Sequence, residues 1–324
     1  MFFYFLWPMA LLIGAGYYLL WRALPEHMRG IRVTFMRELG SFFYSPIAYV
    51  CVVVFTVLSS VLSFTLGQFI EQGDASLTRT FFVYHPWIFA FVAPAIGMRL
   101  WSEEHRQGTI ELLTTMPIAI WHAIVGKFLA AVVVIWAALF ATLPALITIE
   151  ILGDPDWGPA WSGYLSSFLL ATSCLAITSA VSAFTRSQVV AFLVAVLISV
   201  LMLFVGLPPV ANFVGNLPPQ TTAWIVTVVV LGLVFVLRPK GVGLTLGTAV
   251  AGLFFAIALL ISFVPAIGDF AAATAAGVAT NFGFWDHFME MNKGLLLGSD
   301  LIYFLSLIVF CLFTTAVVLK ARRA

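Results

Sequence analysis

The sequence predicts an all-α, polytopic transmembrane helical bundle with about eight to nine spans. Of its 324 residues, 62% are hydrophobic and only 9% are charged, and the mean hydropathy is +1.09. A soluble domain carries about a quarter charged residues, because its surface must face water. The segment between Arg186 and Arg238 contains no Asp, Glu, Lys or Arg. Since a charge inside a bilayer is costly, most of this chain is expected to lie in lipid.

The predicted spans are apolar stretches close to the length of about 20 residues that crosses a bilayer. Their ends contain Pro, Gly, Asn or Asp, which interrupt helices. Residues 1–27 form either an extra N-terminal span or an over-long start, and residues 46–324 form the membrane domain. The nine stretches are Phe2–Trp21, Pro46–Ile70, Thr80–Met98, Phe128–Ile149, Ser162–Thr185, Val189–Leu207, Ala223–Leu237, Val242–Val264 and Leu301–Leu319.

Two further segments mix charged and apolar residues. Residues 28–45 include Arg37 and Glu38 among aromatic and aliphatic residues, which predicts an amphipathic helix in the headgroup plane. The chain is then expected to turn into the membrane at Ser45 and Pro46. The segment Asn281–Gly298 has a similar mixture. Simple membrane anchoring explains both segments as well as a specific role does.

The distribution of basic residues predicts the orientation of the chain. Cytoplasmic loops carry an excess of Lys and Arg. If residues 22–45 are cytoplasmic and each later stretch crosses once, only Arg79 and Lys293 of the 15 basic residues fall outside. We therefore expect a multi-pass protein of the plasma (inner) membrane with a cytoplasmic C-terminus.

The cytoplasmic loop Arg99–Lys127 contains the densest group of charges in the chain. Ser102 is expected to cap a helix whose first turn holds Glu103 and Glu104, where negative charge suits the helix dipole. Gly108 is expected to interrupt this helix.

A second short helix is expected directly after Gly108. Thr109 can cap it, Glu111, Leu112 and Leu113 lie within it, and Pro117 ends it. The two helices would form a compact elbow with charges on one side and apolar side chains on another. From the residues alone, this elbow is either a docking surface for a partner or a solvated connector.

The run from Glu103 to Pro117 resembles the signature of type-2 ABC exporter permeases. It reads Glu-Glu-x-x-x-Gly-Thr-x-Glu-Leu-Leu-x-x-x-Pro. In that family this segment is the coupling-helix region, which contacts the nucleotide-binding ATPase. The resemblance implies that the charged residues bind the ATPase by charge and that the leucines pack into the docking site. The implied coupling residues are Ser102, Glu103, Glu104, Arg106, Gly108, Thr109, Glu111, Leu112, Leu113 and Pro117.

Two other regions resemble the gliding-motility-type branch of these permeases. The first contains Arg37-Glu38-Leu39 and Ser45-Pro46, which resemble the amphipathic helix and the start of the first span. The second lies before the last span and contains His287, Phe288, Gly294, Asp300 and Tyr303. The chain departs from the family in having eight expected spans after the amphipathic helix in place of six, which implies a two-span insertion at 223–264. Met289 also stands where the family often has an acidic residue.

The resemblance implies partners and a mechanism. The chain lacks the P-loop pattern of glycines followed by Lys and Ser or Thr, so ATP and magnesium are expected on a separate ATPase subunit. This chain is expected to be a non-catalytic membrane subunit that binds no cofactor or metal. It would assemble with the ATPase and with a second permease copy or a related subunit, in contact with membrane lipid. No basic run indicates nucleic acid.

Two other classes of protein remain open on the residues alone. An ion-coupled secondary transporter would place ionisable residues near the membrane midplane. His85 is the main candidate, but a structural, hydrogen-bonded role fits its position near the outer end of a span. An intramembrane enzyme could use Asp286, His287 and Glu290 as metal ligands on one helix face. These three residues fit the polar face of an interfacial helix better, and neither HExxH nor GxSxG occurs.

Overall fold

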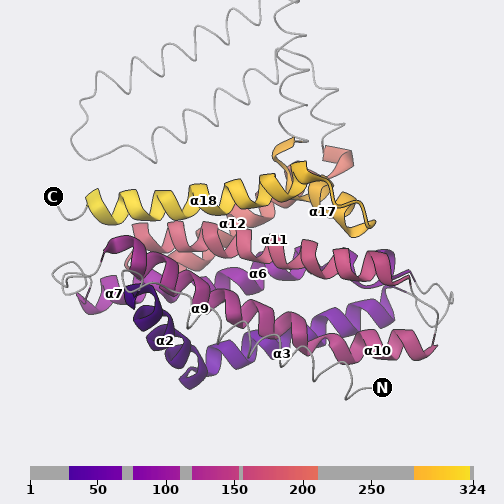
Figure 1. Cartoon of the computed structure of the whole chain (residues 1–324), viewed down its shortest axis with the longest axis horizontal. Helices are drawn as coiled ribbons and strands as arrows, with labels where there is room; N and C mark the ends of the chain where they lie inside the picture. The colour runs from indigo at the N-terminus through magenta and orange to yellow at the C-terminus, as the bar shows by residue number, and fades with distance from the viewer. Residues whose placement is uncertain (1–28, 68–75, 110–118, 153–155, 211–280, 322–324) are drawn as a thin grey trace, which may run out of the picture. The chain divides into compact units, whose positions relative to one another are not determined.

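The computed structural model describes residues 29–67, 76–109, 119–152, 156–210 and 281–321 (Figure 1). Every regular element in these ranges is a helix. Six helical segments among them are long and apolar enough to cross a membrane. The predicted spans Phe2–Trp21, Ala223–Leu237 and Val242–Val264 lie outside the described residues. The chain divides into two compact units, one ending at Val200 and resuming at Phe288, the other running from Leu201 to His287.

The first two described helices follow the prediction closely. Helix α2 runs Arg29–Tyr44 and α3 runs Pro46–Thr65. Ser45 between them has an extended backbone and accepts a hydrogen bond from the backbone N–H of Ile47 at 3.3 Å, so it caps α3. Pro46 occupies the first turn, where its missing N–H removes no helical hydrogen bond.

The third predicted span is built from several short elements. They are α5 (Leu77–Thr80), a 3₁₀ turn η2 (Phe82–Tyr84), α6 (His85–Gly97) and α7 (Arg99–Gln107). Met98 keeps a right-handed helical backbone between α6 and α7. The path therefore continues as one candidate crossing, Leu77–Gln107, which is longer than the predicted stretch.

The fourth predicted span is interrupted near its C-terminal end. Helix α9 runs Ile120–Ala141 and α10 runs Leu143–Leu152, and Thr142 lies between them. Its hydroxyl donates to the carbonyl of Leu139 at 2.6 Å and bonds the Tyr164 hydroxyl at 3.1 Å. Pro144 follows and has no N–H to donate, which favours a break at this point.

Helix α11 (Trp157–Phe184) is the most buried candidate span. Its 28 residues correspond to about 42 Å of helix. It packs against α6, α7, α9 and α18. Small residues allow close approach to α6, because a Cβ added at Gly97 would lie 2.9 Å from the Thr178 methyl. This central helix connects the two ends of the bundle.

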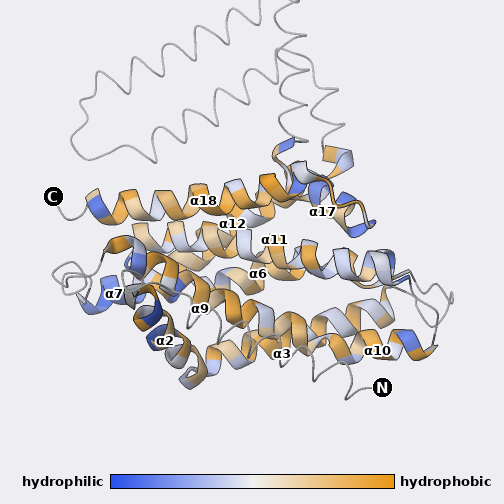
Figure 2. Cartoon of the chain, in the orientation of Figure 1, coloured by the Kyte–Doolittle hydropathy of each residue, from blue (hydrophilic) through white to orange (hydrophobic). Residues whose placement is uncertain are grey.

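The remaining described helices are α12 (Gln188–Val205), α17 (Phe284–Asn292) and α18 (Gly298–Ala321). Figure 2 shows hydrophobic residues along most of α3, α9 and α18, and hydrophilic residues concentrated at α7. Large apolar side chains on α3, α12 and α18 are exposed, as expected for helices that face lipid. These features confirm the predicted all-α polytopic bundle.

Candidate functional site: a buried charge cluster joining α2, α7 and α9

Lys127 lies two turns inside α9, and only 3% of its side chain is exposed. Its ammonium is 2.9 Å from Glu38 Oε1 on α2 and 2.9 Å from Glu104 Oε1 on α7. One lysine therefore joins three helices that are distant in the sequence. Removing one member of a buried ion pair leaves the other charge without a partner. The positions of Lys127, Glu38 and Glu104 therefore depend on one another.

Arg37 completes what we call the charge cluster, defined as Arg37, Glu38, Glu104 and Lys127. Its guanidinium is 2.7 Å from Glu38 Oε1 and 3.3 Å from Glu104 Oε1. The two cations balance the two carboxylates. Burial acts to raise the pKa of Glu38, but the Lys127 ammonium and the Arg37 guanidinium outweigh burial and hold that pKa below its usual range.

Tight packing between α2 and α9 brings the charges together. A Cβ added at Gly126 would lie 2.8 Å from the carbonyl oxygen of Ile31 and 2.8 Å from Cβ of Thr34. The absent side chain lets the backbone of α2 approach the backbone of α9. Lys127 follows directly, so this close approach positions its side chain toward Glu38.

Trp101, in the first turn of α7, attaches this helix to α11. Its side chain is fully buried, and its indole N–H donates to the Ser179 hydroxyl at 3.2 Å. The Lys127 ammonium lies 5.3 Å from the centroid of its ring, within cation–π range. His105 adds a second attachment, with Nε2 lying 3.0 Å from the carbonyl oxygen of Ala183.

Glu103 points to a different surface from its neighbour Glu104. It bonds the Arg106 guanidinium at 2.6 Å and accepts from the Gln107 amide at 2.5 Å. It also accepts from Gln188 at the start of α12. Arg106 is 66% exposed. The exposed patch, defined as Glu103, Arg106 and Gln107, is thus accessible to another molecule through Arg106 and Gln107, whereas Lys127 of the charge cluster is buried and Arg37 lies at the exposed edge of that cluster.

The predicted role of Ser102 as a helix cap is wrong. Ser102 lies in the middle of α7, is fully buried, and donates to the carbonyl of Met98 at 2.5 Å. The helix begins earlier because Met98 continues the helical backbone of α6 and leaves no extended residue to act as a cap. Glu103 and Glu104 are consequently past its first turn.

The predicted end of α7 is confirmed. Gly108 has φ +71°, the left-handed conformation that commonly terminates helices. Thr109 follows, with its backbone N–H donating to the carbonyl of Glu104 at 3.1 Å. Glu111, Leu112, Leu113 and Pro117 lie outside the described residues, and their coupling role stays a prediction.

Comparison with known families decides the class of protein. A family model described as ABC-2 family transporter protein matches residues 34–239, more than half of the chain. The chain belongs to the ABC-2 transporter family. It is therefore a multi-pass permease of the ABC transporter class, and the family is one of membrane subunits. No curated protein matches the chain significantly.

The outer segment of this ABC-2 permease lies far from the charge cluster. His287 and Phe288 are in α17, and Asp300 and Tyr303 are in the first two turns of α18. Gly294, with φ +91°, lies against Pro159 at the start of α11. About 36 Å of helix separates Pro159 from Ala183, which contacts His105. The structure therefore does not bring Gly294 close to α7.

His85 makes a buried hydrogen bond, as the sequence favoured. It is fully buried, and Nδ1 lies 2.8 Å from the Ser167 hydroxyl. The aromatic rings of Phe55, Phe81, Phe82 and Phe89 surround it, with centroids 4.8–6.1 Å away. In the described ranges, no group of three His, Cys, Asp or Glu side chains is arranged to hold a metal ion.

Sequence reasoning missed Lys127 and Trp101 as members of the site. In the sequence, Lys127 contributes only to the distribution of basic residues that predicts the orientation. A usable signal was present, because it is a single charge set between apolar residues in a long apolar stretch. Such a charge in a membrane protein normally faces the interior and has a partner. The sequence did not identify which of the distant carboxylates that partner is.

Proposed function

We propose that this chain is the transmembrane permease subunit of an exporter whose energy comes from ATP hydrolysis by a separate ATPase. ATP and magnesium would bind to that partner. The proposal also includes a second permease copy or a related subunit, a position in the plasma membrane with the C-terminus in the cytoplasm, and membership of the gliding-motility-type branch. The branch assignment depends on the motifs around Arg37-Glu38 and His287-Phe288.

The observation that carries the proposal is the division of α7 into two surfaces. Its exposed patch of Glu103, Arg106 and Gln107 is available to a partner. Its opposite surface is attached to α2 and α9 by the charge cluster, and to α11 by Trp101 and His105. A force applied to the exposed patch would therefore reach three other helices through short contacts, of which those of Lys127, Trp101 and His105 are buried.

In this mechanism ATP-driven closure of the ATPase displaces α7, and the attached helices change their tilt. The nucleotide supplies the differential binding that a two-state change needs. Thr109, Glu111, Leu112, Leu113 and Pro117 would extend the docking surface beyond Gly108. Glu104 would act inside the permease, by transmitting the displacement to α9 and α2.

Co-purification from native membranes tests the assignment. The tagged full-length chain is extracted in mild detergent, and the associated proteins are identified by mass spectrometry. We expect a stoichiometric P-loop ATPase, and we expect Arg106→Glu to reduce its recovery about tenfold, equivalent to about 1.4 kcal/mol of binding. Lys320→Glu, which changes an exposed charge on α18, is the matched control and should leave recovery unchanged.

Glu104→Gln separates docking from transmission. It should leave ATPase recovery unchanged but lower ATP-driven transport, because it alters an internal contact. Recovery of the chain alone under several gentle conditions, or transport that follows an ion gradient without ATP, would overturn the proposal in favour of a secondary transporter.

A further inference from the structure

A large apolar groove lies at the end of the bundle away from the charge cluster. It has a volume of about 900 Å³, within the range of small-molecule sites. Its walls come from the last turns of α9, from α10, and from the first turns of α11. About 22 Å of α11 separates Phe168, in the groove, from Ala183, next to α7. The groove therefore lies toward the end of α11 opposite to the end that contacts α7.

The interior of the groove offers almost no polar atoms. The hydroxyl of Tyr164, which lines it, is already bonded to Thr142 at 3.1 Å. Trp136, Phe140 and Phe168 supply aromatic surface. Glu150 also lines the groove, but this residue is exposed. This environment accepts a hydrocarbon chain and disfavours a polar solute, which would lose its hydrogen bonds to water.

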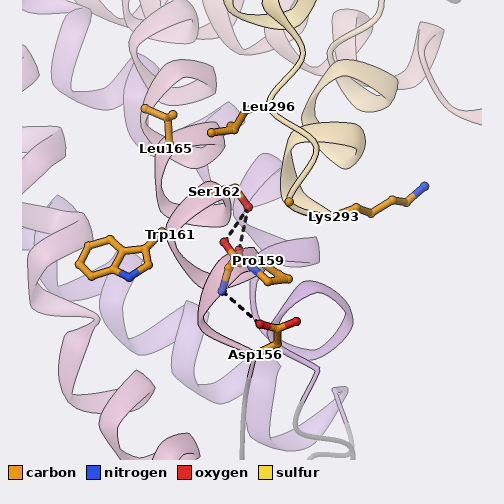
Figure 3. Close-up of a pocket in the computed structure, with 9 residues that line it drawn as sticks. Asp156, Pro159, Trp161, Ser162, Leu165, Lys293 and Leu296 are labelled. Carbon is orange, nitrogen blue, oxygen red and sulfur yellow. Dashed lines mark hydrogen bonds between the residues drawn. The ribbon is translucent and has the colours of Figure 1, made fainter.

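A second, more polar recess lies beside the groove. Its volume is about 430 Å³, and it shares Trp161 and Leu165 with the groove. Asp156 and Ser162 lie on its α11 side, and the loop after α17 contributes Lys293 and Leu296. Figure 3 shows Ser162 directed toward the side of Leu296, Trp161 directed away from it, and the Lys293 side chain directed away from the recess. Trp161 is 55% exposed between the two spaces, as is typical of tryptophan at the membrane interface.

We propose that the groove and the recess together bind one phospholipid of the leaflet away from the charge cluster. An acyl chain lies in the groove against Phe140 and Phe168, and the headgroup lies in the recess near Asp156 and Ser162. The occupant is a lipid because both walls of the groove belong to candidate membrane spans, where the surrounding solvent is hydrocarbon. The polar recess adjoins the groove at the interfacial tryptophan, which matches the division of a phospholipid into chain and head.

This inference goes beyond the proposed function, because lipid binding is a property of this chain and does not depend on an ATPase. The test uses the full-length protein in vesicles of phosphatidylcholine that contain a small fraction of phosphatidylcholine with a photoactivatable acyl chain. After irradiation, labelled peptides are quantified by mass spectrometry. The lipid-exposed residues Val53 and Val57 of α3 report ordinary contact with bulk lipid.

We expect residues 136–168 to be labelled about fivefold more per residue than α3, equivalent to about 1 kcal/mol of preference. Labelling of the groove should saturate as the probe fraction increases, whereas labelling of α3 should rise in proportion. Ala141→Trp, which places a bulky ring in the groove, should reduce groove labelling to the level of α3. Val57→Trp is the control and should leave groove labelling unchanged.

Labelling at equal density on both surfaces, or groove labelling that never saturates, would overturn the proposal. So would undiminished groove labelling in a folded Ala141→Trp protein. If that variant fails to fold, the saturation measurement on the unsubstituted protein still decides the question.

Discussion

Lys127 and Glu104 form an ion pair of 2.9 Å in which 3% of the lysine and 14% of the glutamate side chain are exposed. The pair joins α9 to α7, and the same ammonium reaches Glu38 of α2 at an equal distance. Charges with so little access to water are screened weakly by salt. The charge cluster should therefore hold these helices together at ionic strengths that weaken surface ion pairs.

Replacing Lys127 with Met should destabilise the protein by about 3 kcal/mol, since two carboxylates would lose their shared buried partner. Thermal unfolding in detergent measures the loss. Lys320→Met is the matched control, because Lys320 is exposed in the last turn of α18 and should change stability by less than about 1 kcal/mol. Adding Glu104→Gln to Lys127→Met should restore part of the stability. If the two changes were simply additive, the pair would not be energetically coupled.

The lowered pKa of Glu38 predicts a loss of stability in acid. A carboxyl whose pKa is lower in the folded state contributes its stability above the unfolded pKa of about 4.3. That contribution disappears as the pH falls through the folded value. The stability difference between the unsubstituted protein and Glu38→Gln should be constant from about pH 7 to pH 5.5, and should shrink below about pH 4. A difference that grew on acidification would contradict the assigned direction.

Two glycines provide a matched test of the contact between α2 and α9. A Cβ at Gly126 would meet the α2 backbone at 2.8 Å, whereas nothing lies within 4 Å of a Cβ at Gly40 of α2. Gly126→Ala should cost about 1–3 kcal/mol, because backbone atoms cannot move aside easily. Gly40→Ala should be neutral or stabilising by up to about 1 kcal/mol, since alanine favours helix. Equal melting temperatures for the two variants would mean that α2 does not pack closely on α9.

The corrected position of Ser102 can be tested against true caps. Asp156 accepts the backbone N–H of Gly158 at 3.2 Å and caps α11, as Ser45 caps α3. Asp156→Ala should cost about 1 kcal/mol. Ser102→Ala should change stability by less than about 0.5 kcal/mol, because its hydroxyl bonds a carbonyl already used by the helix. A cost at Ser102 as large as that at Asp156 would contradict this prediction.

The sequence predicted a helix end correctly where a single residue type determines the backbone conformation at that end. Ser45 followed by Pro46 marks the start of α3, and Gly108 ends α7. Hydropathy identified α12 and α18 to within a few residues. In contrast, hydropathy alone does not predict the break at Thr142. Pro144 is a local signal for this break, whereas the hydroxyl contact with Tyr164 comes from another helix and cannot be predicted from the sequence.

The composition of the site was less predictable than the fold. Arg37, Glu38 and Glu104 were all identified, but as separate motifs with separate roles. Their association depends on Lys127, which is distant from Glu38 in the sequence and lies in a stretch that hydropathy describes only as apolar. Periodicity reports which face of a helix is apolar, and it carries no information on which distant helix supplies a countercharge. The family resemblance was correct at the level of the ABC-2 family.

The adjacent glutamates of α7 face different surroundings, and this has an evolutionary consequence. Glu104 pairs with residues of its own chain, so a substitution there should be accompanied by compensating changes at Lys127 or Glu38 in the same gene. Glu103 also bonds its own chain, at Arg106, Gln107 and Gln188, but Arg106 and Gln107 are exposed. Under the proposed function, substitutions at Glu103 should therefore track changes in the gene of the partner ATPase as well as changes in this chain.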